Sequence, residues 1–422
     1  MKRFFQHLLM RYLLIALPLV GFWACEGKEQ KQKLTEEELK VKANELAHKF
    51  IITDGHVDLP YRLRVHMFRL QKVYVDVSQS TEDGDFDYNR AKEGGLDAPF
   101  MSIYVPSSYQ ESGGAKLVAD SLIDIVTGIA EKHPEKFAVA TTPAEVQQNF
   151  EKGLISLPMG MENGAPIEDD LANVKYFYDK GVRYITLTHA TNNQICDSSY
   201  DTTRLWNGLS SFGEMVVEEM NKVGIMVDIS HVSDSTFWDV MKLTKAPVIA
   251  SHSSCRYYTP DFERNMSDEM IKALKENGGV IQINFGSTFI DEKSRTYDGK
   301  AHEYKLKFME EQNLQEGDSL LKAEMKKYRQ ENFFSTVQKV ADHIDHVVKI
   351  AGVDYVGLGS DFDGVGDSLP IGLKDVSDYP NLIFELLKRG YSDEDIEKIC
   401  YKNVFRVWNE VIATAEKLQK EA

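Results

Sequence analysis

The sequence has few cysteines, and those it has are far apart. Only four of the 422 residues are cysteines, and Cys196, Cys255 and Cys400 lie more than fifty residues from one another. Neither a cysteine-ligated metal site nor a network of disulfides is indicated by so few, widely separated residues. We expect these three side chains to be free, mostly buried thiols.

An excess of basic residues is also absent. The chain has 49 lysines and arginines against 66 aspartates and glutamates, which gives a formal net charge of −17 at pH 7. Binding of nucleic acid depends on neutralising phosphates with a basic surface. We therefore expect no nucleic-acid partner, and we interpret the surplus acid as a feature that favours solubility.

No apolar run is long enough for a comfortable transmembrane helix of about 20 residues. The longest, at residues 12–24, follows Arg3 and Arg11 and resembles the core of a signal peptide. It ends at Cys25, and Ala24-Cys25 resembles a bacterial lipoprotein cleavage site, although Phe22 stands where leucine is commoner. An ordinary secretory signal or an uncleaved anchor are the alternatives.

These features predict the organisation of the chain. We expect a lipoprotein signal peptide at residues 1–24, a lipid anchor on Cys25, a flexible tether at residues 25–35 and one catalytic domain at residues 36–422. The protein would then be exported to a bacterial cell envelope and attached to a membrane by its lipid. No internal repeat or low-complexity tract divides the remaining chain.

Eight short apolar runs alternate with helical patterns along the chain, and at least six end in a residue that can bind a metal or move a proton. Alternation of strands and helices indicates a parallel sheet, and eight units favour closure into a (β/α)8 barrel, whose active site lies at the carboxyl ends of the strands. The six runs are residues 51–58, 154–162, 182–189, 224–231, 247–252 and 355–363. Residues 99–105 and 279–285 are the other two predicted strands.

One charged segment interrupts this alternation. Residues 291–330 carry dense charge and few apolar anchors. We interpret them as a partly helical insertion between the seventh strand and its helix, lying over the mouth of the site.

The residues at the ends of the runs are typical metal ligands. His56 and Asp58 are two apart, so on a strand their side chains share one face, and imidazole with carboxylate suits Zn²⁺. His231 and His252 each end a further run. Glu162 follows a glycine-rich segment, and a carboxylate there could bridge two cations about 3.5–4 Å apart.

Several motifs resemble, in order, those of the membrane (renal-type) dipeptidases. They are DGHVDLP at 54–60, LTH at 187–189, DISHVS at 228–233, SHSS at 251–254 and GSDFDG at 359–364. The resemblance covers about residues 51–408. It implies a (β/α)8 barrel with two zinc ions, one held by His56 and Asp58 and the other by His231 and His252, with Glu162 bridging them.

The same resemblance implies roles toward a dipeptide substrate. His189 would contact the scissile carbonyl and stabilise the oxyanion, and Arg264 would bind the substrate carboxylate. Asp361 would orient a hydroxide that bridges the zinc ions and pass its proton to the leaving amine. Asp363 is the weaker candidate, as a structural hydrogen-bond partner.

Two positions depart from the family's usual residues, and five histidines, at positions 66, 133, 302, 343 and 346, fall outside its motifs. Val57 stands where asparagine is common and Asn163 where glycine is common, and both could change the shape of the substrate pocket. His343 and His346 are three apart on a predicted helix, a spacing that could bind metal, but we expect a solvated helix face.

The sequence therefore predicts an exported, lipid-anchored zinc dipeptidase. A binuclear amidohydrolase of the deaminase or phosphotriesterase type is the enzymatic alternative, but such proteins usually open with His-x-His. A surface lipoprotein that binds peptides without catalysis is the other alternative, disfavoured because all the ligand positions are filled. The preferred dipeptides and a homodimeric state are left open.

Overall fold

The computed structural model describes residues 34–421 apart from 68–71 and 73. The predicted signal peptide, Cys25 and most of the tether lie outside these residues. Residues 36–422 form one compact unit. Among the described residues, no helix combines the length and the apolar character needed to cross a membrane.

The core of this unit is a sheet of eight parallel strands in the order β1-β2-β5-β6-β7-β8-β9-β10. Asp58 N donates to Phe362 O at 2.9 Å and Asp361 N donates to His56 O at 3.1 Å, so the carboxyl end of the first strand meets the chain just after the last strand. The predicted (β/α)8 barrel is confirmed. Its strands are β1 (Ile52–Val57), β2 (Leu96–Tyr104), β5 (Met159–Glu162), β6 (Val182–Thr186), β7 (Met226–Asp228), β8 (Ile249–Ser253), β9 (Val280–Ile283) and β10 (Val356–Leu358).

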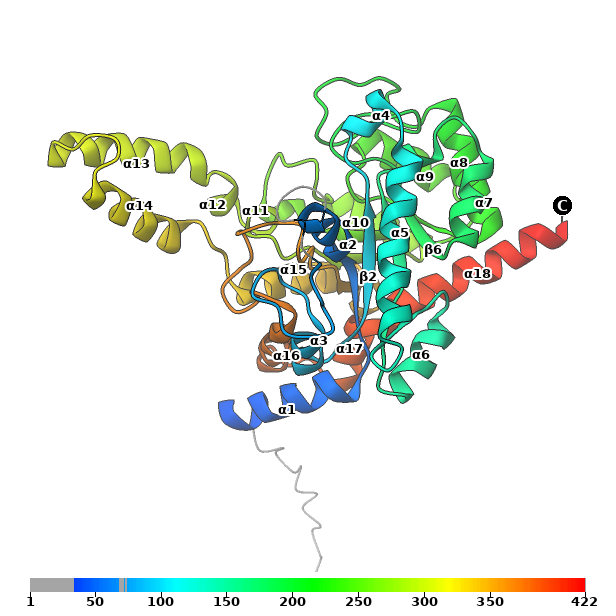
Figure 1. The fold of residues 1–422 in the computed structure, drawn as a ribbon, viewed down its shortest axis with the longest axis horizontal. Helices are drawn as coiled ribbons and strands as arrows, with labels where there is room; N and C mark the ends of the chain where they lie inside the picture. Colours follow the sequence, from blue (N-terminus) through cyan, green and yellow to red (C-terminus); the bar gives the residue numbers. More distant parts are fainter. Residues whose placement is uncertain (1–33, 68–71, 73, 422) are drawn as a thin grey trace, which may run out of the picture. The chain divides into compact units, whose positions relative to one another are not determined.

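Helices surround this barrel (Figure 1). Three of the outer helices are preceded by a serine, Ser210, Ser233 or Ser267, whose side chain accepts a hydrogen bond from an amide of the first turn, as N-caps do. The outer helices are α5 (Ala115–Lys132), α7 (Ala172–Asp179), α8 (Ser211–Val223), α9 (Asp234–Leu243), α10 (Asp268–Asn277), α15 (Val337–Ile350) and α16 (Tyr379–Lys388). Shorter or peripheral helices are α1 (Glu36–Lys49), α2 (Leu59–Val65), α3 (Tyr88–Gly94), α4 (Ser108–Ser112), α6 (Pro143–Glu151) and α17 (Asp393–Glu397).

The last helix, α18 (Asn403–Glu421), closes the amino-terminal end of the barrel. Its Trp408 is fully buried and belongs to an apolar cluster with Ile249 and Val280, the first residues of β8 and β9. The ring of Trp408 lies 5.2 Å from that of Phe100. This end is therefore filled by apolar side chains, and the opposite, carboxyl end is left for chemistry.

The predicted strand at 154–162 is two strands. β4 (Ile155–Leu157) pairs with β3 (Phe137–Val139) in a separate two-stranded sheet, and only β5 enters the barrel. Pro158 stands between β4 and β5 and has no N–H to donate to a ladder. The prediction of one continuous strand was wrong because an apolar run does not show where the chain changes sheets.

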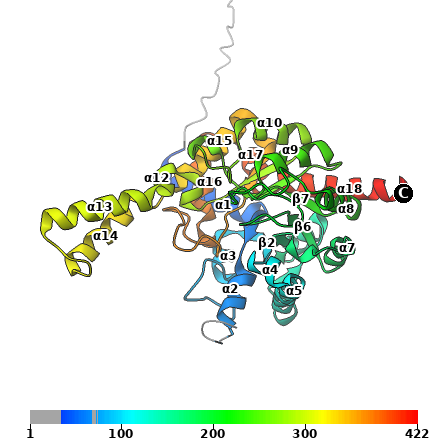
Figure 2. The ribbon, with the colours of Figure 1, turned by 90° about the horizontal axis from the view of Figure 1, so that it is seen from above.

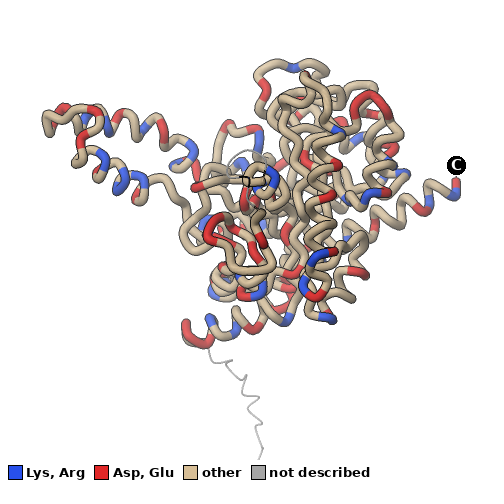
Figure 3. Tube along the Cα trace, in the orientation of Figure 1, with Lys and Arg blue, Asp and Glu red and all other residues tan. Residues whose placement is uncertain are grey.

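The predicted insertion at residues 291–330 consists almost entirely of helices, α12 (Glu292–Arg295), α13 (Tyr297–Gln312) and α14 (Ser319–Asn332), and the short α11 (Ser287–Ile290) precedes it. Figures 1 and 2 both show α13 and α14 extending away from the barrel as a hairpin. Tyr297, Ala301 and Phe333 form a small apolar cluster at its base. The expectation that this segment covers the mouth was therefore wrong for the hairpin, whose helices pack on each other. Acidic and basic residues are interspersed along it, as they are over the barrel (Figure 3).

His343 and His346 do not form a solvated face, and that expectation was wrong. His343 is fully buried, and its Nδ1 accepts a hydrogen bond from Cys255 N while its Nε2 donates to Ile290 O. Burial lowers the pKa of His343 to about 3, so the ring is neutral. His346 Nε2 lies 2.8 Å from Asp268 Oδ1. The three described cysteines are free and buried, as predicted.

Candidate metal centre

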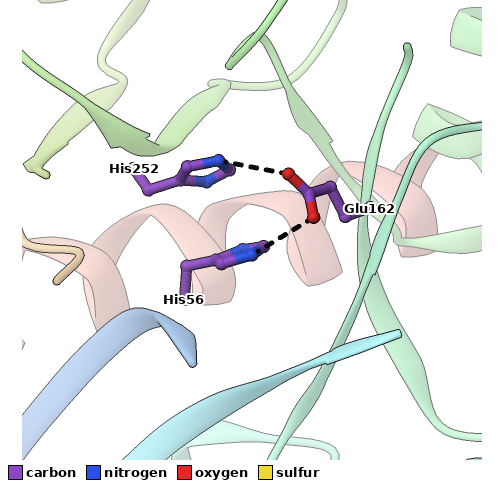
Figure 4. A group of neighbouring side chains, drawn as sticks. All are labelled: His56, Glu162 and His252. Carbon is purple, nitrogen blue, oxygen red and sulfur yellow. Dashed lines mark ion pairs between the residues drawn. The ribbon is translucent and has the colours of Figure 1, made fainter. Parts of the chain in front are cut away.

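The predicted ligands gather at the carboxyl end of the barrel. His56 lies in β1 with Asp58 just after it, Glu162 ends β5, His252 lies in β8, and His231 follows β7. Because all the strands are parallel, their carboxyl ends meet at one face of the sheet. Figure 4 shows His56 and His252 pointing toward the two oxygens of Glu162.

One group of ligand atoms surrounds Glu162 Oε1. Nε2 of His231 and Nε2 of His252 are 2.9 Å apart and lie 3.0 and 3.3 Å from that oxygen. Ligands about 2.0–2.1 Å from a tetrahedral zinc are about 3.3–3.4 Å from one another. These three atoms therefore have the spacing of ligands around one cation.

A second group surrounds the other oxygen of the same carboxylate. Nε2 of His56 lies 3.4 Å from Glu162 Oε2 and 3.6 Å from Asp58 Oδ2. Nε2 of His56 is buried and has no hydrogen-bond partner, although it faces two carboxylates. Burial alone would lower the pKa of His56, but Tyr184, Glu162 and Asp58 outweigh it and hold that pKa well above its usual range. The position therefore favours a positive charge, which a bound metal ion can supply in place of a proton. The residues present fit two metal ions that share Glu162.

The charges of the centre suit metal binding. Burial alone would raise the pKa of Glu162, but neighbouring His189 and His56 outweigh it and hold that pKa well below its ordinary value. Burial lowers the pKa of His231 and of His252 well below the usual range. A carboxylate and neutral imidazoles are the forms in which these groups bind metals.

Two further carboxylates, which the sequence interpretation did not single out, hold the ligand loops. Asp54 Oδ1 accepts hydrogen bonds from the amides of His56 and Ser360, both at 2.9 Å. Asp228 Oδ1 does the same for the amides of Ser230, at 3.0 Å, and Ser251, at 2.8 Å. Asp54 precedes a ligand histidine by two residues and Asp228 by three, and this proximity in the sequence was the available signal.

The backbone at two site residues is unusual. His231 has φ 67° and Asp361 has φ 64°, in the left-handed region that residues other than glycine rarely adopt. Such conformations persist where the surroundings fix them and are common at functional sites. The hydrogen bonds of Asp228 and Asp54 act on the loops that carry these two residues.

A cavity of about 630 Å³ opens beside the ligands. The predicted His189 and Asp361 line it together with Asp58, Glu162 and His231. Burial raises the pKa of Asp361 to about 7 and lowers that of His189. The remaining wall is largely aromatic or apolar, from Tyr104, Tyr200, Phe289 and Val365.

Arg264 is almost completely buried and is not among the residues that line this cavity. Its Nη1 donates to Ser253 Oγ at 2.7 Å and its Nη2 donates to His252 O at 2.8 Å. Its Nε has no partner. Cζ of Arg264 is 5.5 Å from the ring of Phe289, which lines the cavity. The structure therefore brings Arg264 close to the site, but Phe289 and not Arg264 forms the wall of the cavity there.

Asp363 has a structural position. Its Oδ1 accepts hydrogen bonds from Arg62 Nη1 at 3.1 Å and from Asp85 N at 2.6 Å. It lines a different hollow from the one that contains Asp361. This placement agrees with the weaker, structural role that the sequence suggested.

The two departures from the family pattern are accommodated without entering the cavity. Val57 is buried in β1. Asn163 has φ 78°, a backbone conformation that glycine adopts most readily, and its Nδ2 donates to Val105 O and Gln110 Oε1, each at 2.9 Å. Neither residue lines the cavity beside the ligands.

Comparison with known proteins agrees with this geometry. The family model "Membrane dipeptidase (Peptidase family M19)" matches residues 40–422. The chain belongs to the membrane dipeptidase family. Dipeptidase verJ of Clonostachys rogersoniana is 34% identical over 399 residues, which are 92% of this chain and 91% of that protein.

Two solved structures share the fold over nearly their whole length. The probable dipeptidase PvdM from Pseudomonas aeruginosa superposes with a TM-score of 0.73 at 26% identity, covering 90% of this chain and 100% of that one. A Rhodobacter sphaeroides metallopeptidase, solved with a phosphinate mimic of the dipeptide L-Ala-D-Ala, gives 0.67 at 25% identity, covering 86% and 99%. The predicted family and its metallopeptidase barrel are confirmed.

The shared carboxylate leads to a testable expectation about metal content. Glu162→Gln should lower the occupancy of both ion positions together, because it removes the anionic ligand that the two groups have in common. Elemental analysis of purified, metal-loaded and desalted protein should approach two ions per chain for the unaltered enzyme and fall well below one for the variant. Glu168→Gln, at an exposed position in the following loop, is the matched control and should bind as much metal as the unaltered enzyme. A variant that loses one ion and keeps the other would contradict the bridging role.

Proposed function

We propose that this member of the membrane dipeptidase family hydrolyses dipeptides with two zinc ions, bridged by Glu162. The observation that carries the proposal is the pair of ligand groups on the two oxygens of one buried carboxylate. A ligand set of imidazoles and carboxylates suits zinc. The dipeptidase name of its fungal relative and the dipeptide mimic in the bacterial metallopeptidase support a dipeptide as substrate.

When bound, the two zinc ions would polarise the scissile carbonyl and make water a better nucleophile near neutral pH. His56 and Asp58 would hold one ion, and His231 and His252 the other. The protein's own contribution is then to place the substrate, to accept and return one proton, and to stabilise negative charge.

Asp361 is suited to the proton transfer. Its Oδ2 accepts a hydrogen bond from Asn284 Nδ2 at 2.8 Å, which fixes the carboxyl group, and its pKa of about 7 favours both acceptance and release of a proton near neutral pH. We propose that Asp361 takes a proton from the attacking water as the new C–O bond forms. It would then give that proton to the amine nitrogen as the C–N bond breaks.

His189 is suited to stabilising the oxyanion. Its Nε2 lies 3.6 Å from Glu162 Oε1, and its ring packs edge-on against Tyr104 at 4.8 Å between centroids. The lowered pKa makes the ring neutral at pH 7, so it retains one N–H to donate to a developing negative charge. Because the His189 ring is neutral, it adds no positive charge that would repel the proposed metal ions.

Arg264 would recognise the free carboxylate of the dipeptide. Its Nε is buried without a partner, and its terminal nitrogens have hydrogens beyond those bonded to Ser253 and His252, so the guanidinium has unused donors for a carboxylate. The contacts to Ser253 and His252 O hold the guanidinium plane close to the ligand histidines. A carboxylate bound there would limit the length of peptide that reaches the metals.

We also propose export and lipid attachment at Cys25. The support is the charged and apolar pattern of residues 1–24, followed by Ala24-Cys25 and a polar stretch. A diacyl anchor is sufficient for stable attachment, where a single acyl chain is marginal.

The proton-transfer role is tested by Asp361→Asn. The amide keeps the size of the side chain but cannot accept and return a proton, so kcat should fall about 10²–10⁴-fold while the fold is retained. Steady-state hydrolysis and circular dichroism measure the two effects. Asp363→Asn makes the same change in a residue bonded to Arg62 and Asp85, and should retain most of kcat. Near-normal turnover by the Asp361 variant would remove this residue from the mechanism.

The substrate-carboxylate role is tested with a panel of free dipeptides, dipeptide amides and tripeptides. The unaltered enzyme should prefer free dipeptides. Arg264→Ala should raise KM for free dipeptides and so reduce the difference in KM between free dipeptides and dipeptide amides. Loss of a charged hydrogen bond costs about 1.5–3 kcal/mol, which corresponds to a KM increase of roughly 10- to 150-fold. Arg295→Ala, whose Nη2 bonds only to Pro260 O in a more exposed position, is the control. Equal cleavage of all three substrate classes by the unaltered enzyme would refute a dipeptidase.

The lipid anchor is tested by fractionating cells that produce the full chain. The mature protein should begin at Cys25 and partition with membranes, because its acyl chains insert there. Cys25→Ser should be released or remain uncleaved. A soluble native protein with another N-terminus would refute the anchor and leave the enzymology unaffected.

A further inference from the structure

The ring nitrogens of His252 and His56 that face away from the metal groups each contact a hydroxyl group. His252 Nδ1 lies 2.7 Å from Ser251 Oγ, which is 2.6 Å from Asp228 Oδ2. His56 Nδ1 lies 2.8 Å from the hydroxyl of Tyr184, which donates to Gly55 O at 3.0 Å. All of these residues are buried.

We call each series of histidine, hydroxyl and acceptor a relay. The last acceptor in a relay determines the direction of its hydrogen bonds. A carboxylate oxygen and a backbone carbonyl can only accept, so the Ser251 and Tyr184 hydroxyls direct their own hydrogens toward Asp228 and Gly55. Each hydroxyl oxygen must then accept from the imidazole, which places the ring hydrogen on Nδ1. The lone pair therefore lies on Nε2, the atom that faces Glu162 in both histidines.

The two relays end on different groups. The Ser251 relay ends on the carboxylate of Asp228, whereas the Tyr184 relay ends on a neutral carbonyl. Hydrogen bonds to a charged acceptor are the stronger ones, and a carboxylate behind a ligand histidine raises its basicity. The two histidines are therefore supported unequally.

We propose that Ser251 and Tyr184 are positioning residues that fix His252 and His56 as Nε2 metal ligands, and that the Ser251 relay contributes more to metal affinity. The proposal rests on the proposed zinc centre. It predicts that the two hydroxyls act on different ions, because His252 belongs to the group around Glu162 Oε1 and His56 to the group around Oε2.

The structure offers a closely matched control. Asp228 Oδ2 accepts a second hydrogen bond, from Thr186 Oγ1, at 2.5 Å. Thr186→Val removes that bond from the same oxygen atom but leaves the contact between Ser251 and His252. Both Thr186→Val and Ser251→Ala remove one hydrogen bond from Asp228 Oδ2 and would weaken its positioning alike. Only Ser251→Ala also removes the hydroxyl that contacts His252.

The experiment measures stepwise Zn²⁺ affinity of the metal-free full chain by competition with a chromophoric chelator. Ser251→Ala should weaken one binding step about 10- to 100-fold and leave the other unchanged. Tyr184→Phe, which removes only the hydroxyl, should weaken the other step by a smaller factor. Thr186→Val should leave both steps unchanged. Thermal unfolding of each metal-free variant establishes that it is folded.

Asp228→Asn provides a second variant of the same size, with reversed hydrogen-bonding polarity. Its amide Nδ2 would donate to Ser251, whose hydroxyl would then donate to His252 Nδ1 and force the ring hydrogen onto Nε2. A wrong tautomer of this kind disables a histidine whose geometry is intact. We expect Asp228→Asn to weaken the same binding step as Ser251→Ala, by at least as much.

Three results would overturn the proposal. The first is an equal loss of zinc affinity in Ser251→Ala and Thr186→Val. The second is a loss of zinc affinity in Tyr184→Phe as large as that in Ser251→Ala. The third is that Ser251→Ala and Tyr184→Phe weaken the same binding step. Dipeptide hydrolysis at saturating zinc is a separate readout. If the unaltered protein binds zinc as expected but cleaves no dipeptide, the proposed function fails and the relays stand; if it cleaves dipeptides while no variant changes affinity, only the relays fail.

Discussion

The buried carboxylate of Glu162 is the group on which the rest of the site depends. His231 and His252 face one of its oxygens and His56 faces the other, so its orientation sets where both ligand groups meet. A buried, unpaired carboxylate is costly, and the surrounding imidazoles and the proposed cations offset that cost. The parallel barrel supplies the geometry, because ligands from β1, β5, β7 and β8 can meet only where all the strands end on one face.

Around this group, a layer of buried polar residues fixes the ligands in place. Asp54 and Asp228 each accept hydrogen bonds from backbone amides at the carboxyl ends of two different strands. A buried polar network of this kind stabilises a single arrangement only when its members are satisfied. The left-handed backbone at His231 and Asp361 shows that the loops adopt conformations that local preference alone would not select.

The substrate side of the cavity is built from a segment outside the regular repeat of strand and helix. Phe289, on α11 just before the insertion, lines the cavity and lies against Arg264. Asn265 Nδ2 donates to Phe289 O at 2.6 Å, which ties this helix to the loop that carries Arg264. The shape of the substrate pocket is thus connected to the insertion, although its hairpin extends away from the site.

The sequence by itself determined the barrel and the residues at its mouth. Apolar runs that end in His56, Glu162, His231 and His252 carry both signals, because buried parallel strands are apolar and their carboxyl ends meet. Only the tertiary structure decided where the chain changes sheets at Pro158, how the insertion packs, that His343 is buried, and which hydroxyl supports each ligand. Those features depend on contacts between residues far apart in the chain and on side-chain direction, which local periodicity does not record.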